Sequence, residues 1–361
     1  MIKRSALFCF LILTSFLWGE NNLRFFSLRS DAPGPTKEYR VLGIGSYSWD
    51  YIQPVSDQLL ETIYLQKKDW RSVTWKEFSE MLTLFQCYPE PTIKTGGSTA
   101  NTMKGLAAFG ISAALTGNVG LDKRGDELIF AMESAGVIPL VTRTSTPTSQ
   151  IACLITPDGE RSFCSFVEAE SEITCNDLHP SYFEKTDLVH IEGYLLRNHC
   201  VVDYAMQLAQ KNGALVSYDL CCTQLGEKYR ERLWALLAEY VDIFFCDSDE
   251  AYSLTHLPPK EACVFLKNFC PIVVVKIGAD GCWVASREKF FHCPAIPANS
   301  VDTTGAGDLF ASGFLYGVLE GYSLEEAAYF GSVCGSAVVE QPGGEIPENR
   351  WTEIVKLIQE H

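Results

Sequence analysis

Short apolar runs recur along the chain from residue 41 and alternate with longer amphipathic segments. The apolar runs lie at 41–46, 112–117, 151–156, 187–191, 214–219, 241–245 and 271–275. Helical periodicity is found at 98–109, 122–135, 200–212, 227–240 and 260–269, and again at 305–320, 323–340 and 350–360. Because strands alternate with helices and are apolar throughout, the pattern predicts an α/β fold with a doubly wound, mostly parallel sheet buried on both faces.

Two stretches break this alternation. Residues 139–167 read as strand, turn and strand, with a Pro-Asp-Gly turn at 157–159 between the segments CLIT and RSFCSF, which is typical of a β-hairpin. Residues 53–94 are polar and aromatic, with room for one or two helices. We therefore expect a small β-rich lid, built from about 47–95 and 139–170, over one end of the main domain.

The first residues resemble a secretory signal. In 1–19, two basic residues precede an apolar stretch of 14 residues. As a helix this stretch spans about 21 Å, which is short of the roughly 30 Å core of a bilayer, so we expect no stable membrane span. Bulky residues occupy the expected cleavage site. We interpret 1–38 as a signal-like segment and linker outside the fold, and 39–361 as the folded domain.

The net charge and the cysteine and histidine patterns argue against several classes of function. The 361 residues include 29 Lys and Arg against 45 Asp and Glu, a net charge of −16, which argues against nucleic-acid binding because that needs a basic surface. None of the 14 cysteines forms a CxxC pair, and most lie in apolar runs, as expected of free thiols in a reducing compartment. The scattered histidines make a zinc site improbable. We expect a cytoplasmic protein despite the signal-like segment.

The strongest chemical motif is DTTGAGD at 302–308, directly before an apolar helix. Small residues at a helix start leave the backbone N–H groups accessible, and the positive end of the helix dipole attracts anions. Asp308 in the first turn then lies beside a bound phosphate as a candidate general base. The alternative interpretation is an ordinary helix start in which Asp308 only complements the dipole.

Two further segments carry candidate binding groups. GGSTAN at 96–101 opens a helix, and its glycines allow close approach of a ligand while Asn101 offers an amide to hydroxyl groups. Asp50 follows the first strand, where paired hydrogen bonds to sugar hydroxyls are possible. Each has a plainer interpretation: 96–101 as a strand–turn–helix junction, and Asp50 as a solvated turn residue.

Taken together, the motifs GGSTANTMKGLAAFG and DTTGAGDLFASGFLYGVL resemble the two signatures of the ribokinase-like (PfkB) carbohydrate kinase family. The resemblance covers roughly residues 39–350, and DTxGAGD is highly specific. The GGST-x-N form and the long segment 53–94 are most similar to the adenosine-kinase-like branch.

The resemblance implies a role for each residue of these motifs. Asp308 matches the family's catalytic base, and Gly305, Ala306 and Gly307 match the anion hole for the transferring phosphoryl group. The residues implied to contact the acceptor substrate are Asp50, Gly96, Gly97, Asn101 and, as a weaker match, Glu192.

On the nucleotide side the matching residues are Asp247, Glu250, Lys276 and Gly278. The family's Asn-x-x-Glu reads here as DSDE, so Glu250, implied to serve Mg²⁺ indirectly, is kept. Asp247 replaces Asn and adds a negative charge near the phosphates, which costs affinity unless Mg²⁺ bridges. Lys276, where many members have Thr, either compensates as a nearby cation or points into solvent. Asp302 and Thr304 match the place where many members bind a monovalent cation.

The resemblance therefore implies a kinase that transfers the γ-phosphoryl group of ATP, with Mg²⁺ and in many members K⁺, to a primary hydroxyl of a sugar or nucleoside. Alternatives are a ribokinase- or fructokinase-type enzyme for free sugars, or a non-catalytic ligand-binding protein on the same scaffold. An adenosine-type acceptor needs an apolar slot, for which Trp49, Phe166 and Tyr194 are candidates. The sequence leaves monomer and homodimer open.

Overall fold

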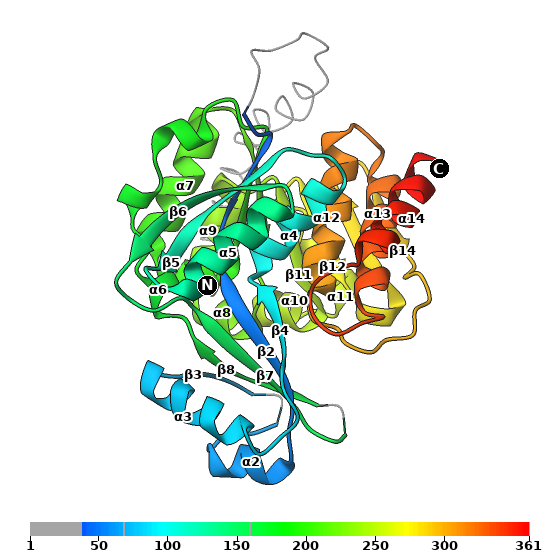
Figure 1. Ribbon diagram of the computed structural model, residues 1–361. Coiled ribbons are helices and arrows are strands. Elements are labelled where there is room, and N and C mark those ends of the chain that lie inside the picture. The colour runs from blue at the N-terminus through cyan, green and yellow to red at the C-terminus, as the bar shows by residue number, and fades with distance from the viewer. Residues whose placement is uncertain (1–37, 68, 159, 361) are drawn as a thin grey trace, which may run out of the picture.

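The computed structural model describes residues 38–67, 69–158 and 160–360 (Figure 1). The signal-like segment 1–19 and the rest of the chain up to residue 37 lie outside the described residues.

The main body is built on a nine-stranded sheet. Its strands follow the order β14-β13-β12-β11-β10-β9-β1-β5-β6, and neighbours from β6 to β12 are parallel. In chain order the strands are β1 (Val41–Ile44), β5 (Ala113–Gly120), β6 (Val137–Thr144), β9 (Leu188–Glu192), β10 (Leu215–Asp219), β11 (Ile243–Asp247), β12 (Ile272–Lys276), β13 (Cys282–Ser286) and β14 (Phe290–Cys293). The expected mostly parallel sheet is confirmed.

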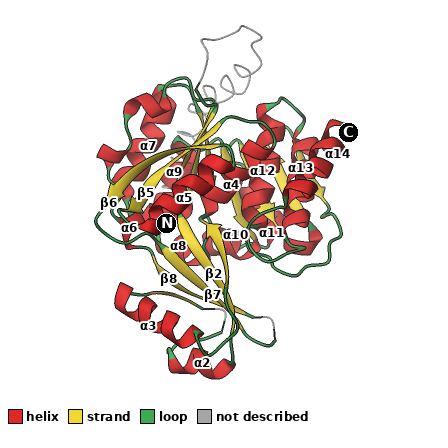
Figure 2. Cartoon of the chain, in the orientation of Figure 1, coloured by secondary structure: helices red, strands yellow, loops and turns green. Residues whose placement is uncertain are grey.

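Helices cover both faces of this sheet (Figures 1 and 2). One face carries α4 (Ser98–Ala108), α5 (Lys123–Ser134), α12 (Ala306–Leu319) and α13 (Leu324–Val338), with α14 (Glu348–Gln359) packed outside α13. The other carries α7 (His199–Lys211), α8 (Thr223–Lys228), α9 (Arg230–Glu239), α10 (Ser248–Thr255) and α11 (Pro259–Leu266).

Alternation along each strand explains this arrangement. In β11, Ile243 and Phe245 pack with the α12 face, whereas Phe244 and Cys246 pack with the α10 face. Side chains of a strand point alternately to opposite faces, so a strand that is apolar at every position can be buried from both sides. The apolar runs of the sequence thus dictate the two helical layers.

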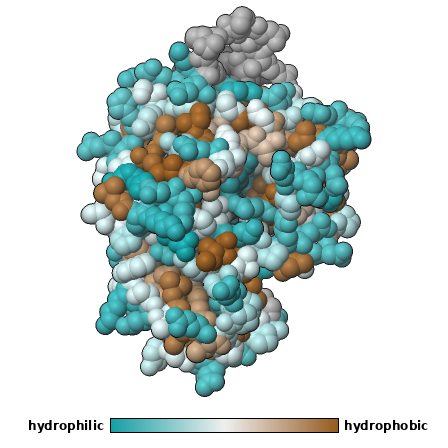
Figure 3. Space-filling view, viewed as in Figure 1, coloured by the Kyte–Doolittle hydropathy of each residue, from teal (hydrophilic) through white to brown (hydrophobic). Residues whose placement is uncertain are grey.

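A second, smaller sheet projects from the main body as the lower, narrower part of the molecule (Figures 1 and 3). Its order is β3-β8-β7-β2-β4, with β2 (Ser48–Pro54), β3 (Trp70–Ser72), β4 (Thr92–Gly96), β7 (Gln150–Ile155) and β8 (Arg161–Phe166). Helices α2 (Asp57–Thr62) and α3 (Trp75–Phe85) give it an apolar core of its own. This is the β-rich lid, and β7 and β8 are its antiparallel hairpin.

Three features differ from the sequence interpretation. Strand β6, whose residues from 139 we assigned to the lid, pairs with β5 in the large sheet throughout Val137–Thr144. Helix α10 was not predicted, and neither was the antiparallel pair β13 and β14 at the sheet edge. Helix α10 and strands β13 and β14 have only eight, five and four residues, so local periodicity gives little signal for them. Strand β6 has eight residues, and its pairing with β5 places it in the large sheet.

The visible surface is mostly hydrophilic, with scattered apolar patches (Figure 3). Throughout the described residues, no helix combines the length and the apolar character needed to cross a bilayer.

Candidate active site

The amino end of α12 is the centre of the site. Gly305 precedes this helix with φ of +75°, and a Cβ added to it would lie 2.6 Å from the Cα of Gly344, so both its conformation and its packing require glycine. The first-turn N–H groups of a helix have no partner within the helix. Together with the positive end of the dipole, such groups suit a phosphoryl group, although the Ala306 N–H already donates to the Thr303 carbonyl at 3.2 Å.

Asp308 lies in the first turn of α12 and is held by two side chains of α4. Ser98 Oγ donates to its Oδ1 at 2.7 Å, and Asn101 Nδ2 donates to its Oδ2 at 2.9 Å. Burial raises the pKa of Asp308 to about 6, although the bonds from Asn101 and Ser98 oppose the shift. A carboxylate that is oriented and gains a proton near pH 6 is suited to accept one from a hydroxyl group.

Helix α4 presents these two side chains because of how it begins. Gly97 caps it with φ of +105°, and a Cβ there would lie 2.2 Å from the carbonyl oxygen of Ser46. Ser98 and Asn101 are three residues apart and therefore share one face of the helix, which packs against α12. The sequence pointed to Asn101 as a substrate contact, whereas here its amide group orients Asp308; its Oδ1 is buried without a partner.

Glu192 at the end of β9 lies behind the start of α4. Its Oε1 accepts bonds from the Ser46 N–H at 3.0 Å and Ser46 Oγ at 2.7 Å, and its Oε2 accepts one from the Thr99 N–H at 3.0 Å. The residue is fully buried, and burial raises its pKa. Its observed contacts tie β9, the β1–β2 connection and α4 together, which fits a positioning residue better than a direct substrate contact.

Asp50 of β2 lies against the Gly96 backbone in the neighbouring strand β4. Its Oδ1 accepts a bond from Ser48 Oγ at 2.9 Å. Burial raises its pKa to about 6, while the bond from Ser48 and the charge of Lys104 act in the opposite direction. The site therefore holds two carboxylates, Asp50 on the lid side and Asp308 on the main body, that both titrate near pH 6.

Lys276 ends β12 and points at the anion site. A Cβ added to Gly307 would lie 2.9 Å from its Nζ, and Nζ also forms an ion pair with Asp219 Oδ2 at 2.9 Å. Burial disfavours its charge, but Asp219 and Glu250 outweigh burial and hold the pKa of Lys276 above its usual range. Of the two sequence interpretations, the nearby cation is the one that this geometry supports.

Asp219 is a residue that the sequence interpretation missed. It is the last residue of β10 and only 2% exposed. A signal was available, because ligands of open α/β sheets bind at the carboxyl ends of the parallel strands, and the run ALVSYD ends in this acid.

Asp247 and Glu250 form a reciprocal cap at the start of α10. Asp247 Oδ1 accepts from the Glu250 N–H, and Glu250 Oε2 accepts from the Asp247 N–H, both at 2.8 Å. Asp and Asn cap helices about equally well, which gives the Asp for Asn replacement a structural explanation. Burial, reinforced by Asp247, raises the pKa of Glu250 to about 8.

Gly278 opens the turn after β12 with φ of +61°, and a Cβ at this position would meet open space. In the part of the chain that the structure describes, no group of three or more His, Cys, Asp or Glu side chains is arranged to hold a metal ion. Since Glu250 is engaged in its cap, it fits the implied indirect contact to Mg²⁺ rather than direct ligation.

Asp302 is engaged on both carboxylate oxygens. The Thr304 N–H donates to Oδ1 at 2.7 Å and the Gly343 N–H donates to Oδ2 at 2.9 Å. Arg161 of the lid strand β8 places its Nη2 2.9 Å from Oδ1 and donates from Nη1 to Thr303 Oγ1 at 2.7 Å. These contacts do not fit the monovalent cation that the resemblance implies for Asp302 and Thr304, because a guanidinium already supplies the positive charge there.

A second charged cluster ties the lid to the 341–345 loop. Glu345 Oε1 accepts bonds from Thr95 Oγ1 at 2.5 Å and Lys104 Nζ at 2.8 Å, and Lys94 Nζ lies 3.9 Å from its Oε2. Lys94 and Thr95 belong to β4 of the lid, while Glu345 follows α13. The lid is therefore joined to the two loops that flank the start of α12.

The three aromatic candidates for an apolar slot have separate surroundings. Trp49 donates from Nε1 to the Arg124 carbonyl and lies under its guanidinium. Phe166 is fully buried in the lid core. Tyr194 is half-buried, and its hydroxyl donates to the Cys221 carbonyl at 3.2 Å. Cys221 in turn lies 3.4 Å from Ser98 Oγ, so Tyr194 has the most direct connection with the groups around Asp308.

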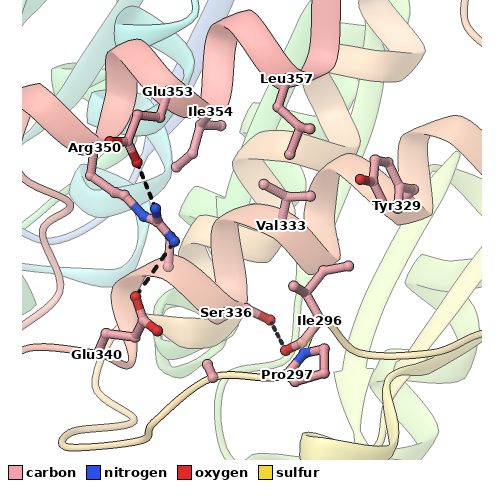
Figure 4. A pocket seen from close by; sticks show the side chains of 12 residues that line it. Ile296, Pro297, Tyr329, Val333, Ser336, Glu340, Arg350, Glu353, Ile354 and Leu357 are labelled. Atoms are coloured by element: carbon pink, nitrogen blue, oxygen red, sulfur yellow. Dashed lines mark hydrogen bonds and ion pairs between the residues drawn. The ribbon is translucent and has the colours of Figure 1, made fainter. Parts of the chain in front are cut away.

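A hollow of about 120 Å³ lies elsewhere, between α13, α14 and the 296–298 loop (Figure 4). Arg350 bridges its rim, with Nη1 at 2.6 Å from Glu353 and Nη2 at 3.6 Å from Glu340. None of the residues expected at the catalytic site lines it. This hollow is therefore separate from the groups that surround Asp308.

The doubly wound sheet, the β-rich lid and the helix start facing an oriented carboxylate define the class as a ribokinase-like phosphotransferase fold. Residues 88–351 match the pfkB family of carbohydrate kinases, and the chain belongs to this family. It is a kinase of the sugar and nucleoside type, which transfers phosphoryl groups to a hydroxyl acceptor.

Named relatives and solved structures support this assignment. An uncharacterized sugar kinase of Archaeoglobus fulgidus is 27% identical over 66% of this chain and 96% of its own length. A probable sugar kinase protein from Rhizobium etli superposes with a TM-score of 0.82 and 28% identity, covering 90% of this chain and 99% of its own. The adenosine kinase from Sinorhizobium meliloti gives 0.82 and 27%, covering 89% of this chain and 100% of its own. These two solved structures, a probable sugar kinase and an adenosine kinase, thus match the chain about equally well.

Proposed function

We propose that the protein transfers the γ-phosphoryl group of ATP to a primary hydroxyl of a sugar or nucleoside, with Asp308 as general base. The observation that carries the proposal is the pair of bonds from Ser98 and Asn101, which orients Asp308 beside the start of α12. As the acceptor oxygen attacks phosphorus, its proton passes to Asp308, and the bond from phosphorus to the leaving ADP oxygen breaks.

The backbone N–H groups of Gly305, Ala306 and Gly307 are the proposed anion hole. Donors held at a helix start need little rearrangement as charge develops on the transferred group, which is the condition for effective electrostatic stabilisation. The Ala306 N–H would exchange its present bond to the Thr303 carbonyl for one to the phosphoryl group. Lys276 adds a full positive charge beside Gly307. In this role it offsets the negative charge that Asp247 contributes on the nucleotide side.

The nucleotide is proposed to lie along the carboxyl ends of β11 and β12, near Asp247, Lys276 and the open turn at Gly278. Mg²⁺ bound with ATP would neutralise phosphate charge, and Glu250 would reach it through water. Such an arrangement is in accord with the capped position of Glu250 and with the open space around Gly278.

The acceptor is proposed to lie between the lid and α4, within reach of Asp50, Gly96 and Gly97. Asp50 would accept bonds from acceptor hydroxyls, and the lid contacts to the main body would exclude water that otherwise competes for ATP. Two carboxylates, Asp50 and Asp308, would suit a polar acceptor with several hydroxyl groups, a property that sugars and nucleosides share.

The reaction consumes ATP, so we propose a cytoplasmic location. All thirteen cysteines among the described residues are free thiols, eight of them buried, and such a set is suited to a reducing compartment.

The direct test is an ADP-release assay on the full chain with ATP and Mg²⁺, using adenosine, inosine, ribose, fructose and phosphosugars as acceptors. We expect acceptor-dependent ADP release that the Asp308→Asn variant loses. A parallel incubation with γ-labelled ATP and a metabolite extract covers acceptors outside this panel. ATP binding without any labelled product in either experiment would contradict the proposal and favour the ligand-binding alternative.

A further inference from the structure

Arg161 connects the lid to the loop that leads into the proposed anion hole. It is the first residue of β8, and its guanidinium contacts Asp302 and Thr303, both in the loop before α12. The Asp302 side chain is only 3% exposed and that of Arg161 is 19% exposed. An ion pair shielded to this degree is screened far less by solvent and salt than a surface pair.

The carboxylate of Asp302 fixes the backbone that follows it. It accepts the N–H of Thr304 at 2.7 Å and the N–H of Gly343 at 2.9 Å. Gly305, whose φ of +75° starts α12, is the next residue after Thr304. The position of the proposed anion hole thus depends on a buried carboxylate whose charge must be neutralised, because an uncompensated buried charge is strongly unfavourable.

Among the described residues, Arg161 is the side-chain cation paired with Asp302. A monovalent metal ion at this carboxylate would have to lie within a few ångströms of the guanidinium, and two like charges at such a distance repel each other. It would also compete for Asp302 Oδ1, which already accepts a hydrogen bond from the Thr304 N–H and forms an ion pair with Arg161. The site is therefore complete without a metal ion.

We propose that Arg161 takes the place of a monovalent cation, so that the lid itself supplies the charge that orders the loop 302–305. The inference rests on the proposed phosphoryl transfer. Arg161 is a positioning residue in this scheme, because it acts on the anion hole through Asp302. Two consequences follow: wild-type turnover does not depend on K⁺, and the anion hole is fully ordered only when the lid contacts the main body.

The lid contacts around Glu345 provide a second connection for this coupling. The 341–345 loop donates the Gly343 N–H to Asp302, and a Cβ added to Gly343 would lie 3.1 Å from Lys94 Cγ of the lid. Lid strands therefore meet Asp302 from two sides, directly through Arg161 and indirectly through Gly343. Movement of the lid away from the main body would break both connections.

The test compares wild type, Arg161→Met and Arg161→Lys in KCl and in N-methylglucamine chloride of equal ionic strength. The melting temperature and the kinetics of ATP turnover are both measured. We expect K⁺ to change neither the Tm nor the kcat of the wild-type protein. In Arg161→Met we expect kcat to fall by up to about 10²-fold, as misplacement of catalytic groups can cause, with less change in KM, and we expect K⁺ to raise both Tm and kcat.

Arg161→Lys keeps the charge, so K⁺ should have little effect on it. Arg71→Met is the matched control, since Arg71 lies in lid strand β3 and is within 3.7 Å of Glu77, away from Asp302. It should behave as wild type in both salts.

A specific rise in wild-type Tm or kcat with K⁺ would overturn the inference. So would an Arg161→Met variant that gains nothing from K⁺ in either readout, whatever its residual activity. The Tm comparison requires no turnover, so it still decides the question if the proposed kinase reaction is not observed. Conversely, absence of turnover in wild type under both salts would count against the proposed function alone.

Discussion

Replacement of Asp308 by Asn should make the protein more stable and much less active at the same time. Burial in a poorly solvated site raises the pKa of the Asp308 carboxylate from 3.8 to about 6, although the hydrogen bonds from Asn101 and Ser98 oppose this shift. The variant keeps both contacts, since its amide oxygen can accept from Asn101 and its amide NH₂ can donate to the Ser98 hydroxyl. It removes only the buried charge and the ability to take up a proton.

The size of the stability change follows from the pKa. The folded state favours the neutral carboxyl of Asp308. The stability that this group contributes is therefore fully present below pH 3.8 and is lost as pH rises through about 6. Above that range the charged Asp308 costs the folded state about 3 kcal/mol relative to a neutral group, at 1.36 kcal/mol for each pKa unit. Asp308→Asn should therefore raise Tm by a few degrees at pH 7.5, and the gain should nearly vanish at pH 4.

The activity should change in the opposite direction. Loss of a general base typically lowers kcat by about 10²- to 10⁴-fold, while ATP binding should change little. In wild type, kcat should decline as pH falls through about 6, because the base must be unprotonated, and this dependence should be absent from the residual activity of the variant.

Calorimetry at pH 4 and pH 7.5 and ADP-release kinetics between pH 5 and pH 8 measure both effects. The matched control is Asp126→Asn, which alters an exposed first-turn acid of α5 and should leave turnover unaffected. Near wild-type turnover in Asp308→Asn would refute the assignment of the base. A stability gain of equal size at both pH values would refute the burial argument.

The remaining predictions concern the nucleotide side of the site. Lys276→Met removes the cation beside Gly307 and leaves Asp219 as an uncompensated buried charge, so we expect weaker ATP binding and a lower Tm. Adding Asp219→Asn should restore much of the Tm without restoring ATP affinity, and titration calorimetry with thermal melts separates the two effects; equal recovery of both would contradict the electrostatic role. Asp247→Ala removes the side-chain cap of α10 and should cost about 1 kcal/mol of stability, whereas Asp247→Asn should be nearly neutral. Urea unfolding measures this difference, and an equal loss in both variants would argue against the cap.

Much of the fold was predictable because its signals are local. The apolar runs that became β1, β5, β9, β10, β11 and β12 are continuous, and a parallel sheet covered by helices on both faces is the way to bury such runs completely. The hairpin β7–β8 was also predictable from its turn and its alternating flanks. The pair β13–β14 was not, since an edge hairpin forms through pairing with a neighbouring strand.

The residues of the candidate site also fall into two groups, those that the sequence identifies and those that only the structure identifies. Glycines next to a helix start can be identified from the sequence, so the 305–308 motif and the glycine at position 97 could be recognised directly. Asp219 could have been found from its place at the end of a buried strand. Lys276 could be seen in the sequence, but whether it faced the phosphate site or solvent could not, because the direction of a side chain depends on its partner, here Asp219.

By itself, the sequence determined the layered sheet, the motif at the start of α12 and the family to which they belong. The tertiary structure decided which side chains surround these elements. It directs Asn101 to Asp308, engages Glu192 behind α4, and brings Arg161 from the lid to Asp302, 141 residues further along the chain. The physical reason is that backbone conformation and burial follow from neighbouring residues, whereas an ion pair or a hydrogen bond between distant segments exists only after the chain has folded.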